Sequence, residues 1–349
     1  MGRKFFTTSQ GIRLPVNEKK YLLPFLTSTS KGTNYFETPK NIGIKKEYLA
    51  DKLLQLHQFL DILNSLGIKT NKKSFIDIGT GNGLIPKFLL MTNYFSNVIG
   101  TDKYSPYEHR SANIPMEDEA FVKFFEYFKK KIKKNFLAYS SYEKDIKGTA
   151  EKEIFKPYKI KISKINYNKV NEYKFKKFGA DELHNLKKKY DFVYCKGIEH
   201  IPNWKNVVKN ILSVSRKKTF VYIKTRPFFS YLGPHRFATT AIPWGHALLN
   251  DKEYVRYVNQ FHKERKNQMI NNYFNALTMP RYSSDQLIQI FESFNYSLIC
   301  KKVETPPYIK EITKFKKLIP KFNSIIKNKK NITNEDLSSS VQHLIFQKN

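Results

Sequence analysis

The chain has 349 residues, with 62 Lys and Arg against 30 Asp and Glu, so its formal net charge is +32 at pH 7. Its 40% of apolar residues can build a substantial core, which excludes wholesale disorder, and two cysteines exclude a disulfide framework or a cysteine-based metal cluster. No apolar run reaches the ~20 residues that a bilayer-spanning helix needs, and residues 1–6 lack the apolar core of a signal peptide, so we expect a cytoplasmic protein without a transmembrane segment.

The excess of basic residues leaves two explanations open. An anionic partner such as a nucleic acid would account for the scarcity of acids. However, Lys far outnumbers Arg, the residue favoured for paired phosphate and base contacts, and the abundance of Lys, Asn, Ile, Phe and Tyr is typical of an AT-rich genome. A nucleic-acid partner is therefore kept as the alternative and not as the first expectation.

The N-terminal part divides into an arm and a helix. Residues 1–44 carry scattered Pro, Gly, Ser and Thr without periodicity, which predicts an irregular arm. Residues 45–66 repeat Leu at spacings of three and four, which predicts an amphipathic helix that ends at Gly67. From this helix onward, residues 45–349 are expected to form one domain.

Residues 74–90 hold the most informative pattern of the chain. The run SFIDIGTGNG predicts a short buried strand and a glycine-rich turn, and LIPKFLL after it predicts a helix. This combination places backbone N–H groups beside a crevice at the carboxyl end of a sheet. The spacing differs from a dinucleotide fingerprint, because Leu84 occupies the position of the last glycine. An acid is instead followed by alternating glycines: Asp77, Gly79, Gly81 and Gly83.

A second predicted strand, residues 97–102, ends in Asp102, whose carboxylate can accept hydrogen bonds from two ribose hydroxyls. Together, FIDIGTGNG and VIGTD resemble the first two motifs of the class I S-adenosylmethionine-dependent methyltransferases. The resemblance implies a seven-stranded, mostly parallel Rossmann-like α/β sheet with helices on both faces, and S-adenosyl-L-methionine as the cofactor. Lysine-rich helical insertions are expected in addition.

Three segments are longer than the connections of that fold and are expected to be insertions, at about residues 111–170, 226–280 and 304–338. The first contains a helical pattern whose end is crowded with lysines. This is either a solvated end favoured by the helix dipole or a patch for an anionic surface. The third contains a basic excursion at 310–330, either a solvated helix or a cradle for an anionic substrate.

Residues 173–178 predict a third strand that leads to Ala180 and Asp181. By resemblance, Asp181 accepts a hydrogen bond from the adenine amine and Ala180 offers its N–H, although Asp181 could instead cap a helix. The resemblance implies a cofactor-binding set at the strand ends, formed by Asp77, Gly79, Thr80, Gly81, Gly83, Asp102, Lys103, Ala180, Asp181, Cys195 and Lys196.

The fourth predicted strand, residues 189–196, is followed by the pair Glu199 and His200. In some relatives, an E-x-x-E-H version of this motif binds a divalent cation. Here Lys196 replaces the first Glu, and its ammonium would repel a metal, so no metal is expected. His200 is the first candidate for a general base, with Glu199 as a substrate contact, while a structural histidine at a helix start is the alternative.

Residues 203–214 predict a helix and residues 219–224 the central fifth strand. The long segment 226–280 combines aromatics, Gly, Pro and two histidines near a strand end, which is typical of a substrate lid. The alternative is a packed insertion whose aromatics are core, and residues 253–277 are expected to form a helix over it. The expected substrate-facing residues are His235, Arg236, Trp244 and His246, with His246 as the second candidate base.

The C-terminal part completes the predicted sheet. Ser283 is expected to cap a helix over residues 284–291, and residues 296–303 and 341–347 predict two strands. The two strands resemble the antiparallel pair that closes a methyltransferase sheet.

The reaction class is narrowed by what the sequence lacks. There is no N/D-P-P-Y/F run, which argues against methylation of an adenine amine, and no Pro-Cys pair for a cytosine nucleophile. The expected function is O-methylation of a small molecule, sugar or cell-surface glycan precursor with a His general base. The alternatives are an RNA methyltransferase that uses the basic insertions, or a non-catalytic nucleic-acid-binding protein on the same fold.

Overall fold

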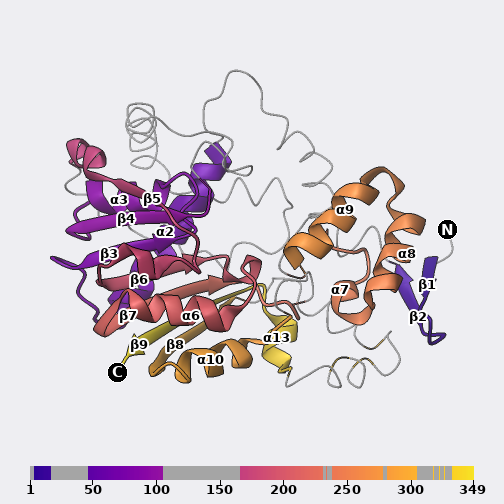
Figure 1. Ribbon diagram of the computed structural model, residues 1–349. Coiled ribbons are helices and arrows are strands. Elements are labelled where there is room, and N and C mark those ends of the chain that lie inside the picture. Colours follow the sequence, from indigo (N-terminus) through magenta and orange to yellow (C-terminus); the bar gives the residue numbers. More distant parts are fainter. Residues whose placement is uncertain are drawn as a thin grey trace. The chain divides into compact units, whose positions relative to one another are not determined.

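The computed structural model describes residues 4–16, 46–104, 166–230, 233, 238–277, 281–304, 317, 322, 326 and 332–349. Within these residues, seven strands form one sheet with the order β5-β4-β3-β6-β7-β9-β8 (Figure 1). In chain order the strands are β3 Ser74–Ile78, β4 Asn97–Asp102, β5 Lys174–Lys177, β6 Tyr190–Lys196, β7 Ser215–Thr225, β8 Tyr296–Glu304 and β9 Val341–Lys348.

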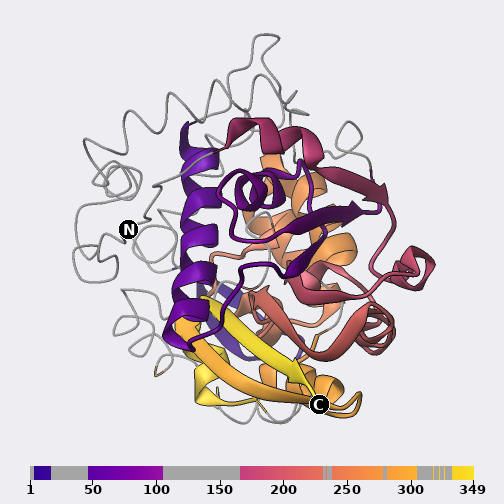
Figure 2. The same ribbon diagram turned by 90° about the vertical axis from the view of Figure 1, so that its left-hand side faces the viewer.

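The sheet is built outward from β3. The chain steps through β4 to the edge strand β5 and then places β6 on the other side of β3, and these pairs are all parallel. The order therefore reverses between β3 and β6, which is where open α/β sheets bind their ligands. At the other edge, the Ser340 N–H donates to the Glu304 carbonyl, so β9 starts where β8 ends and the two run antiparallel (Figure 2). The predicted sheet is confirmed.

The chain forms two compact units that are interleaved in sequence. The first unit contains residues 1–32, 197–208 and 223–346, and the second contains residues 33–196, 209–222 and 347–349. Residues near the N-terminus therefore group with the C-terminal half of the chain and not with the segment that directly follows them.

Aromatic rings fill the core of the second unit. Phe59, on helix α2 (Lys46–Ser65), has its ring 4.9 Å from that of Tyr222 and 5.2 Å from that of Tyr194. Phe75 of β3 lies 6.0 Å from Phe59, and all four side chains are almost completely buried. Burial of large aromatics is the main favourable contribution to such a core.

Two helices of the second unit begin and end close to where the sequence predicts. At the end of α2, Gly67 has φ 66°, and the Ile68 N–H donates to the Leu63 carbonyl over 2.9 Å, which closes the helix in the expected way. Helix α3 (Leu84–Met91) begins directly after Gly83, and every one of its residues is buried. The other helical segments are η2 Tyr167–Glu172, η3 Leu183–Leu186 and α6 Trp204–Ser213, the last shared between the two units.

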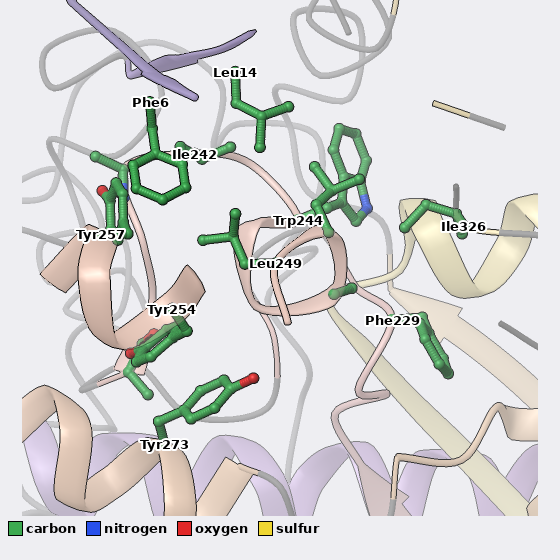
Figure 3. Close-up of a cluster of buried hydrophobic side chains, with 14 of the residues drawn as sticks. Phe6, Leu14, Phe229, Ile242, Trp244, Leu249, Tyr254, Tyr257, Tyr273 and Ile326 are labelled. Carbon is green, nitrogen blue, oxygen red and sulfur yellow. Dashed lines mark hydrogen bonds between the residues drawn. The ribbon is translucent and has the colours of Figure 1, made fainter. Parts of the chain in front are cut away.

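A hairpin opens the first unit. Strands β1 (Lys4–Thr7) and β2 (Arg13–Val16) pair antiparallel, so the prediction of an irregular arm is wrong for residues 4–16. Phe6 and Leu14 from this hairpin belong to a buried apolar cluster with residues such as Ile242, Trp244 and Tyr257 (Figure 3). The hairpin was missed because four-residue strands are too short to show a clear alternation of apolar and polar residues.

The single helix predicted over 253–277 is divided in the structure. Helix α8 (Asp251–Phe261) starts two residues earlier, because Asn250 and Glu253 form a reciprocal capping box. It stops at His262, whose φ of −133° is not helical, and the chain continues as η6 Lys263–Arg265, α9 Lys266–Asn272 and the π-helical turn η7 Tyr273–Leu277. Tyr254 and Tyr273, from the two sides of this break, stack with centroids 3.6 Å apart (Figure 3).

The remaining helices of the first unit are short. They are η4 Ile198–His200, α7 Gly245–Leu248, α10 Ser284–Glu292 and α13 Asn334–Ser338. Ser283 caps α10 through a capping box with Gln286, as predicted. Among the described residues, no helix has the length and apolar character needed to cross a bilayer.

Candidate functional site

The glycine turn after β3 is held in one shape by the strands below it. Gly79, Gly81 and Gly83 all have left-handed backbone, with φ of 73°, 59° and 73°, which glycine adopts without the strain that most side chains would incur. The N–H groups of Gly79 and Thr80 both donate to the Thr101 carbonyl, over 2.8 and 3.0 Å. Asp77 is buried beneath the turn and accepts a 2.8 Å hydrogen bond from the Thr80 hydroxyl, so its first role is to fix the turn.

Asp102 stands at the end of β4 beside this turn and is only 7% exposed. One carboxylate oxygen accepts the Gly81 N–H at 3.0 Å and the other accepts the Tyr104 N–H at 3.1 Å. These bonds orient the carboxylate, and a carboxylate can accept about four hydrogen bonds in all. Asp102 thus has the chemistry and the fixed position that a pair of ribose hydroxyls requires.

At Gly79 and Gly81 no side chain of the described residues covers the backbone of the turn. A Cβ atom placed on Gly81 would meet nothing within 4 Å, and one placed on Gly79 would meet only the Lys196 carbonyl oxygen at 3.9 Å. A ligand can therefore approach the main chain closely at these positions. Open backbone next to an oriented carboxylate fits the adenosyl group of S-adenosylmethionine.

The inner side of the turn is occupied by Tyr173, which sequence reasoning took only as the start of a strand. A Cβ on Gly83 would stand 2.6 Å from its hydroxyl oxygen, and a Cβ on Gly100 would overlap with both Tyr173 and Thr80. The Lys87 ammonium lies 5.5 Å from the centroid of the Tyr173 ring. The signal in the sequence was Gly100 itself, because a glycine inside a strand marks a place where another group approaches closely.

Register brings the other predicted cofactor residues to the same end of the strands. Ile78 pairs with Thr101 on one side and with Cys195 on the other, and Asp102 pairs with Lys177. Cys195 is buried, Lys196 is half-buried and Lys103 is exposed. All of these residues belong to the second unit.

Ala180 and Asp181 follow β5 in a turn that is closed by a hydrogen bond from the Glu182 N–H to the Gly179 carbonyl. Ala180 is nearly buried and Asp181 is exposed. Glu182, and not Asp181, occupies the N-cap position of η3, so the helix-capping alternative for Asp181 does not hold. Its role at the adenine stays a prediction.

His200 is presented by a short turn of the first unit. Gly197 enters η4 with φ of 89°, and a Cβ there would stand 3.4 Å from His200 Cδ2, so glycine makes room for the imidazole. The Ile198 carbonyl accepts a 2.8 Å hydrogen bond from the Trp204 indole, which fixes the turn. The His200 side chain is exposed.

Glu199 is buried, unlike its exposed neighbour His200. One of its carboxylate oxygens accepts the Thr225 hydroxyl at 2.9 Å and the other accepts the Arg226 N–H at 3.3 Å. Because the side chain is 7% exposed, these bonds anchor the turn to the end of β7. The structure thus gives Glu199 a positioning role next to His200 in place of the expected substrate contact.

Trp244 and His246 are both 1% exposed and lie in the core of the first unit. The Trp244 indole donates to the Leu337 carbonyl at 3.1 Å, and His246 Nε2 donates to the Phe228 carbonyl at 2.6 Å. Gly233 lies over the His246 ring, where a Cβ would stand 3.0 Å from its atoms. For these two residues the structure shows the packed-insertion alternative, so neither faces a substrate.

Other candidates lie outside the described residues. These are His235 and Arg236 and most of the two lysine-rich insertions expected at 111–170 and 304–338. Within the latter, Phe322 and Ile326 are described, and both are buried in the apolar cluster of the first unit. Within the part of the chain that the structure describes, no group of three His, Cys, Asp or Glu side chains could hold a metal ion.

A buried ionic group lies at the adjoining ends of β7, β8 and β9. His343 Nε2 lies 2.6 Å from a carboxylate oxygen of Glu304. Burial lowers the pKa of His343, so the imidazole is neutral at pH 7 and donates its N–H to the carboxylate. Burial alone would raise the pKa of Glu304, but this hydrogen bond and the charge of Lys224 hold it below its usual range. The group therefore fixes the strand ends next to the anchor of Glu199.

Comparison with known proteins points to one family. A family model described as a methyltransferase domain matches residues 46–301, from the first residue of α2 into β8. This is more than two thirds of the chain. A comparison with curated proteins gives no significant match.

Among solved structures, the plantazolicin methyltransferase BpumL in complex with SAH is 13% identical, with a TM-score of 0.40 over 93% of this chain and 90% of that chain. A Thermotoga maritima protein described as an S-adenosylmethionine-dependent methyltransferase is 11% identical, with a TM-score of 0.38 over 87% of this chain and 96% of that one. The YcgJ protein of Bacillus subtilis is 13% identical, with a TM-score of 0.39 over 84% and 99% of the two chains.

Proposed function

Because the chain belongs to the methyltransferase-domain family and is an S-adenosylmethionine-dependent methyltransferase, we propose that it methylates a hydroxyl group with His200 as the general base. The acceptor we propose is a small molecule, a sugar or a glycan precursor. The observation that carries this proposal is the arrangement of η4, in which Glu199 and Ile198 are tied back to the protein while His200 is exposed.

The cofactor end of the proposal uses residues of the second unit. The backbone of Gly79 to Gly83 and the Asp102 carboxylate would hold the adenosyl group, and Tyr173 would keep the turn in place from below. When bound, S-adenosylmethionine supplies an electrophilic methyl group, so the protein contributes chiefly by positioning. Asp77 and Thr80 contribute indirectly, because they fix the conformation of the glycine turn.

The acceptor end needs a group that removes a proton. A neutral hydroxyl is a weak nucleophile, and a histidine within hydrogen-bond reach can take its proton as it attacks. His200 suits this task because its backbone is fixed by the His200 N–H to Gly197 carbonyl bond and by the anchored Glu199. We prefer His200 to His246, because His246 is buried and its Nε2 donates to the Phe228 carbonyl.

The proposal is tested by a His200→Ala variant, assayed for methyl transfer to a panel of small alcohols, phenols, sugars and RNA. With an acceptor that the wild-type enzyme methylates, we expect kcat of the variant to be about 10²- to 10⁴-fold lower, because a positioned base contributes that much. Added imidazole should restore part of the rate. Affinity for S-adenosylhomocysteine, measured by calorimetry, should not change.

The matched control is His184→Ala, which removes an exposed histidine whose Nδ1 contacts the Asn210 side chain at 2.8 Å. It should neither lose activity nor respond to imidazole. A His200→Ala enzyme with normal kcat would contradict the role of His200 as the general base. Transfer only to RNA would instead favour the RNA methyltransferase alternative.

A further inference from the structure

Cations gather at the amino ends of the strands in the second unit. They occupy the loops before β3 and β6, the first residues of β7 and the end of β9, and we call them the lysine edge: Lys69, Lys72, Lys73, Lys187, Lys188, Lys189, Arg216, Lys217, Lys218 and Lys348. All are exposed except Lys348, which is half-buried. In the same stretches, residues 69–73, 187–191, 216–218 and 347–349, the one acidic residue is Asp191.

The sheet brings these four segments into a row. Strands β3, β6, β7 and β9 are neighbours in that order, and adjacent strands lie about 4.8 Å apart. The Tyr190 N–H donates to the Val214 carbonyl, which joins the start of β6 to the start of β7. The Lys348 ammonium donates to the Ser215 carbonyl, which adds the end of β9.

Asp191, the one acidic residue of these stretches, is engaged in bonds within the protein. One Asp191 carboxylate oxygen accepts the N–H and the hydroxyl of Ser74, at 2.8 and 2.7 Å, and the Arg216 guanidinium lies 3.3 Å from the other oxygen. Burial alone would raise the pKa of Asp191, but the bonds from Ser74 and the charges of Arg216 and Lys73 hold it below its usual range. Asp191 therefore offsets only part of the positive charge in the row.

The backbone gives a second, independent observation. Lys72 before β3, Lys187 before β6 and Lys218 near the start of β7 have φ of 62°, 49° and 63°. This left-handed conformation is disfavoured for a side chain such as lysine, whereas Gly and Asn adopt it readily. Among the other described non-glycine residues in this conformation, three are asparagines, at Asn93, Asn203 and Asn295, and one is Trp244. Lysine is thus disfavoured by the backbone at all three positions, and its positive charge offers a reason for its presence there.

We propose that the lysine edge binds the phosphate backbone of a nucleic acid without reading its sequence. A row of ammonium groups suits a linear polyanion, whose bound counterions are released on contact. Nine of the ten cations are Lys, which contacts phosphate as a point charge, and Arg for base recognition is represented by Arg216 alone. Tyr190, the aromatic residue among them, is buried and offers no surface on which a base could stack.

This site is separate from the cofactor site of the same unit. The glycine turn follows the carboxyl end of β3, whereas Lys72 and Lys73 precede its amino end, and five strand residues span about 16 Å. A nucleic acid on the lysine edge would therefore act as an anchor for the enzyme and would not be the acceptor positioned at the glycine turn. The inference goes beyond the proposed function and does not depend on it.

The test is binding of a fluorescently labelled 20-nucleotide RNA of mixed sequence to the full chain, measured by anisotropy over a range of salt. In the triple variant Lys72→Asn, Lys187→Asn and Lys218→Asn, the slope of log K against log salt should become shallower by about 2, because about 0.7 ion is released per contact. At 0.1 M salt this corresponds to a loss of about 100-fold in affinity. The melting temperature should stay equal or rise, because asparagine suits the left-handed backbone.

The matched control removes three exposed lysines of the first unit, as Lys252→Gln, Lys263→Gln and Lys266→Gln. It lowers the net charge equally and should leave RNA affinity within about twofold of the wild type. Equal loss in both triple variants, or no loss in the first, overturns the proposal. So does lysine-edge-dependent binding to phosphatidylserine vesicles without binding to RNA. Calorimetry with S-adenosylhomocysteine should give the same affinity for all three proteins.

Discussion

At the scale of single residues, Gly100 and Tyr173 explain how a flexible glycine turn is kept rigid. Glycines allow the backbone shape that the turn needs, but they also allow many others, so something outside the turn must select one. Tyr173 fills the space that side chains at Gly83 and Gly100 would occupy, and its ring is further confined by Lys87. Rigidity of the turn therefore depends on a residue that need not touch the cofactor.

The first prediction concerns this contact. A Gly100→Ala variant should be destabilised by about 1–3 kcal/mol, the usual cost of overpacking, and should bind S-adenosylhomocysteine more weakly because the turn is displaced. Adding Tyr173→Phe removes the hydroxyl that the new methyl group meets, and it should recover part of both losses. Urea denaturation and calorimetry on the four proteins of this cycle give the coupling energy. Additive losses would mean that the two residues do not act on each other.

His262 supplies a prediction about pH. Burial, aided by the charge of Arg265, lowers the pKa of this imidazole to about 4. Its Nε2 accepts the Tyr257 hydroxyl at 2.9 Å, and Tyr257 in turn accepts the Ala241 N–H at 2.7 Å, so the neutral ring is the one that the fold requires.

An unfolded histidine has a pKa near 6.5, so between pH 6.5 and about 4 the unfolded chain binds a proton that the folded chain does not. Stability should therefore fall as the pH falls through this window, by about 2 kcal/mol from this residue between pH 7 and pH 5. A His262→Gln variant, which keeps an acceptor for Tyr257, should lose that dependence. Urea unfolding of both proteins at the two pH values measures it, and the contributions of His343, Glu304 and Asp191 cancel in the difference. If both proteins lose the same free energy of unfolding between pH 7 and pH 5, the dependence does not come from His262.

At the scale of elements, the parts foreseen from sequence are those whose shape is decided locally. The strand before Gly79, the end of α2 at Gly67 and the cap at Ser283 each follow from a few neighbouring residues. The convergence of Asp102 and Gly81 could also be expected, because consecutive parallel strands end at the same edge. These features define the cofactor end of the site.

The acceptor end could not be foreseen in the same way, because burial is decided by distant residues. Trp244 is in the core because its indole meets Leu337, 93 positions later in the chain, and His246 because Phe228 and Gly233 enclose it. The sequence shows that these side chains are aromatic but not whether they are exposed. The break at His262 was missed for a similar reason, since Tyr254 and Tyr273 stack only if the helix turns between them.

At the scale of the whole molecule, the first unit has an apolar core of its own. Phe6 is 1% exposed, its ring centroid lies 5.6 Å from that of Tyr257, and the Arg256 guanidinium lies 4.9 Å from it. Further buried members come from residues 228–273 and 322–337. The N-terminal hairpin is therefore part of what holds this unit together.

The corresponding prediction is that Phe6→Ala destabilises the protein by about 3–5 kcal/mol, as expected for loss of a buried aromatic ring. Thermal unfolding followed by circular dichroism measures the change. Phe5→Ala, at a half-buried position in the same strand, is the control and should cost clearly less. Affinity for S-adenosylhomocysteine, measured below the melting temperature, should match that of the wild type, since the cofactor residues lie in the other unit. A Phe6→Ala variant with the melting temperature of the wild type would mean that the hairpin does not stabilise the unit.

The interleaving of the two units has a consequence for biosynthesis. The chain passes from one unit to the other five times, and Phe6 and Leu14 share a cluster with Ile332 and Leu337. At about 5–20 residues per second on the ribosome, the hairpin waits on the order of 15–60 seconds for those partners to emerge. Until then the cluster that covers its apolar face is incomplete, although partners such as Tyr257 emerge earlier. Nascent chains of this protein should therefore be clients of ribosome-associated chaperones for much of their translation.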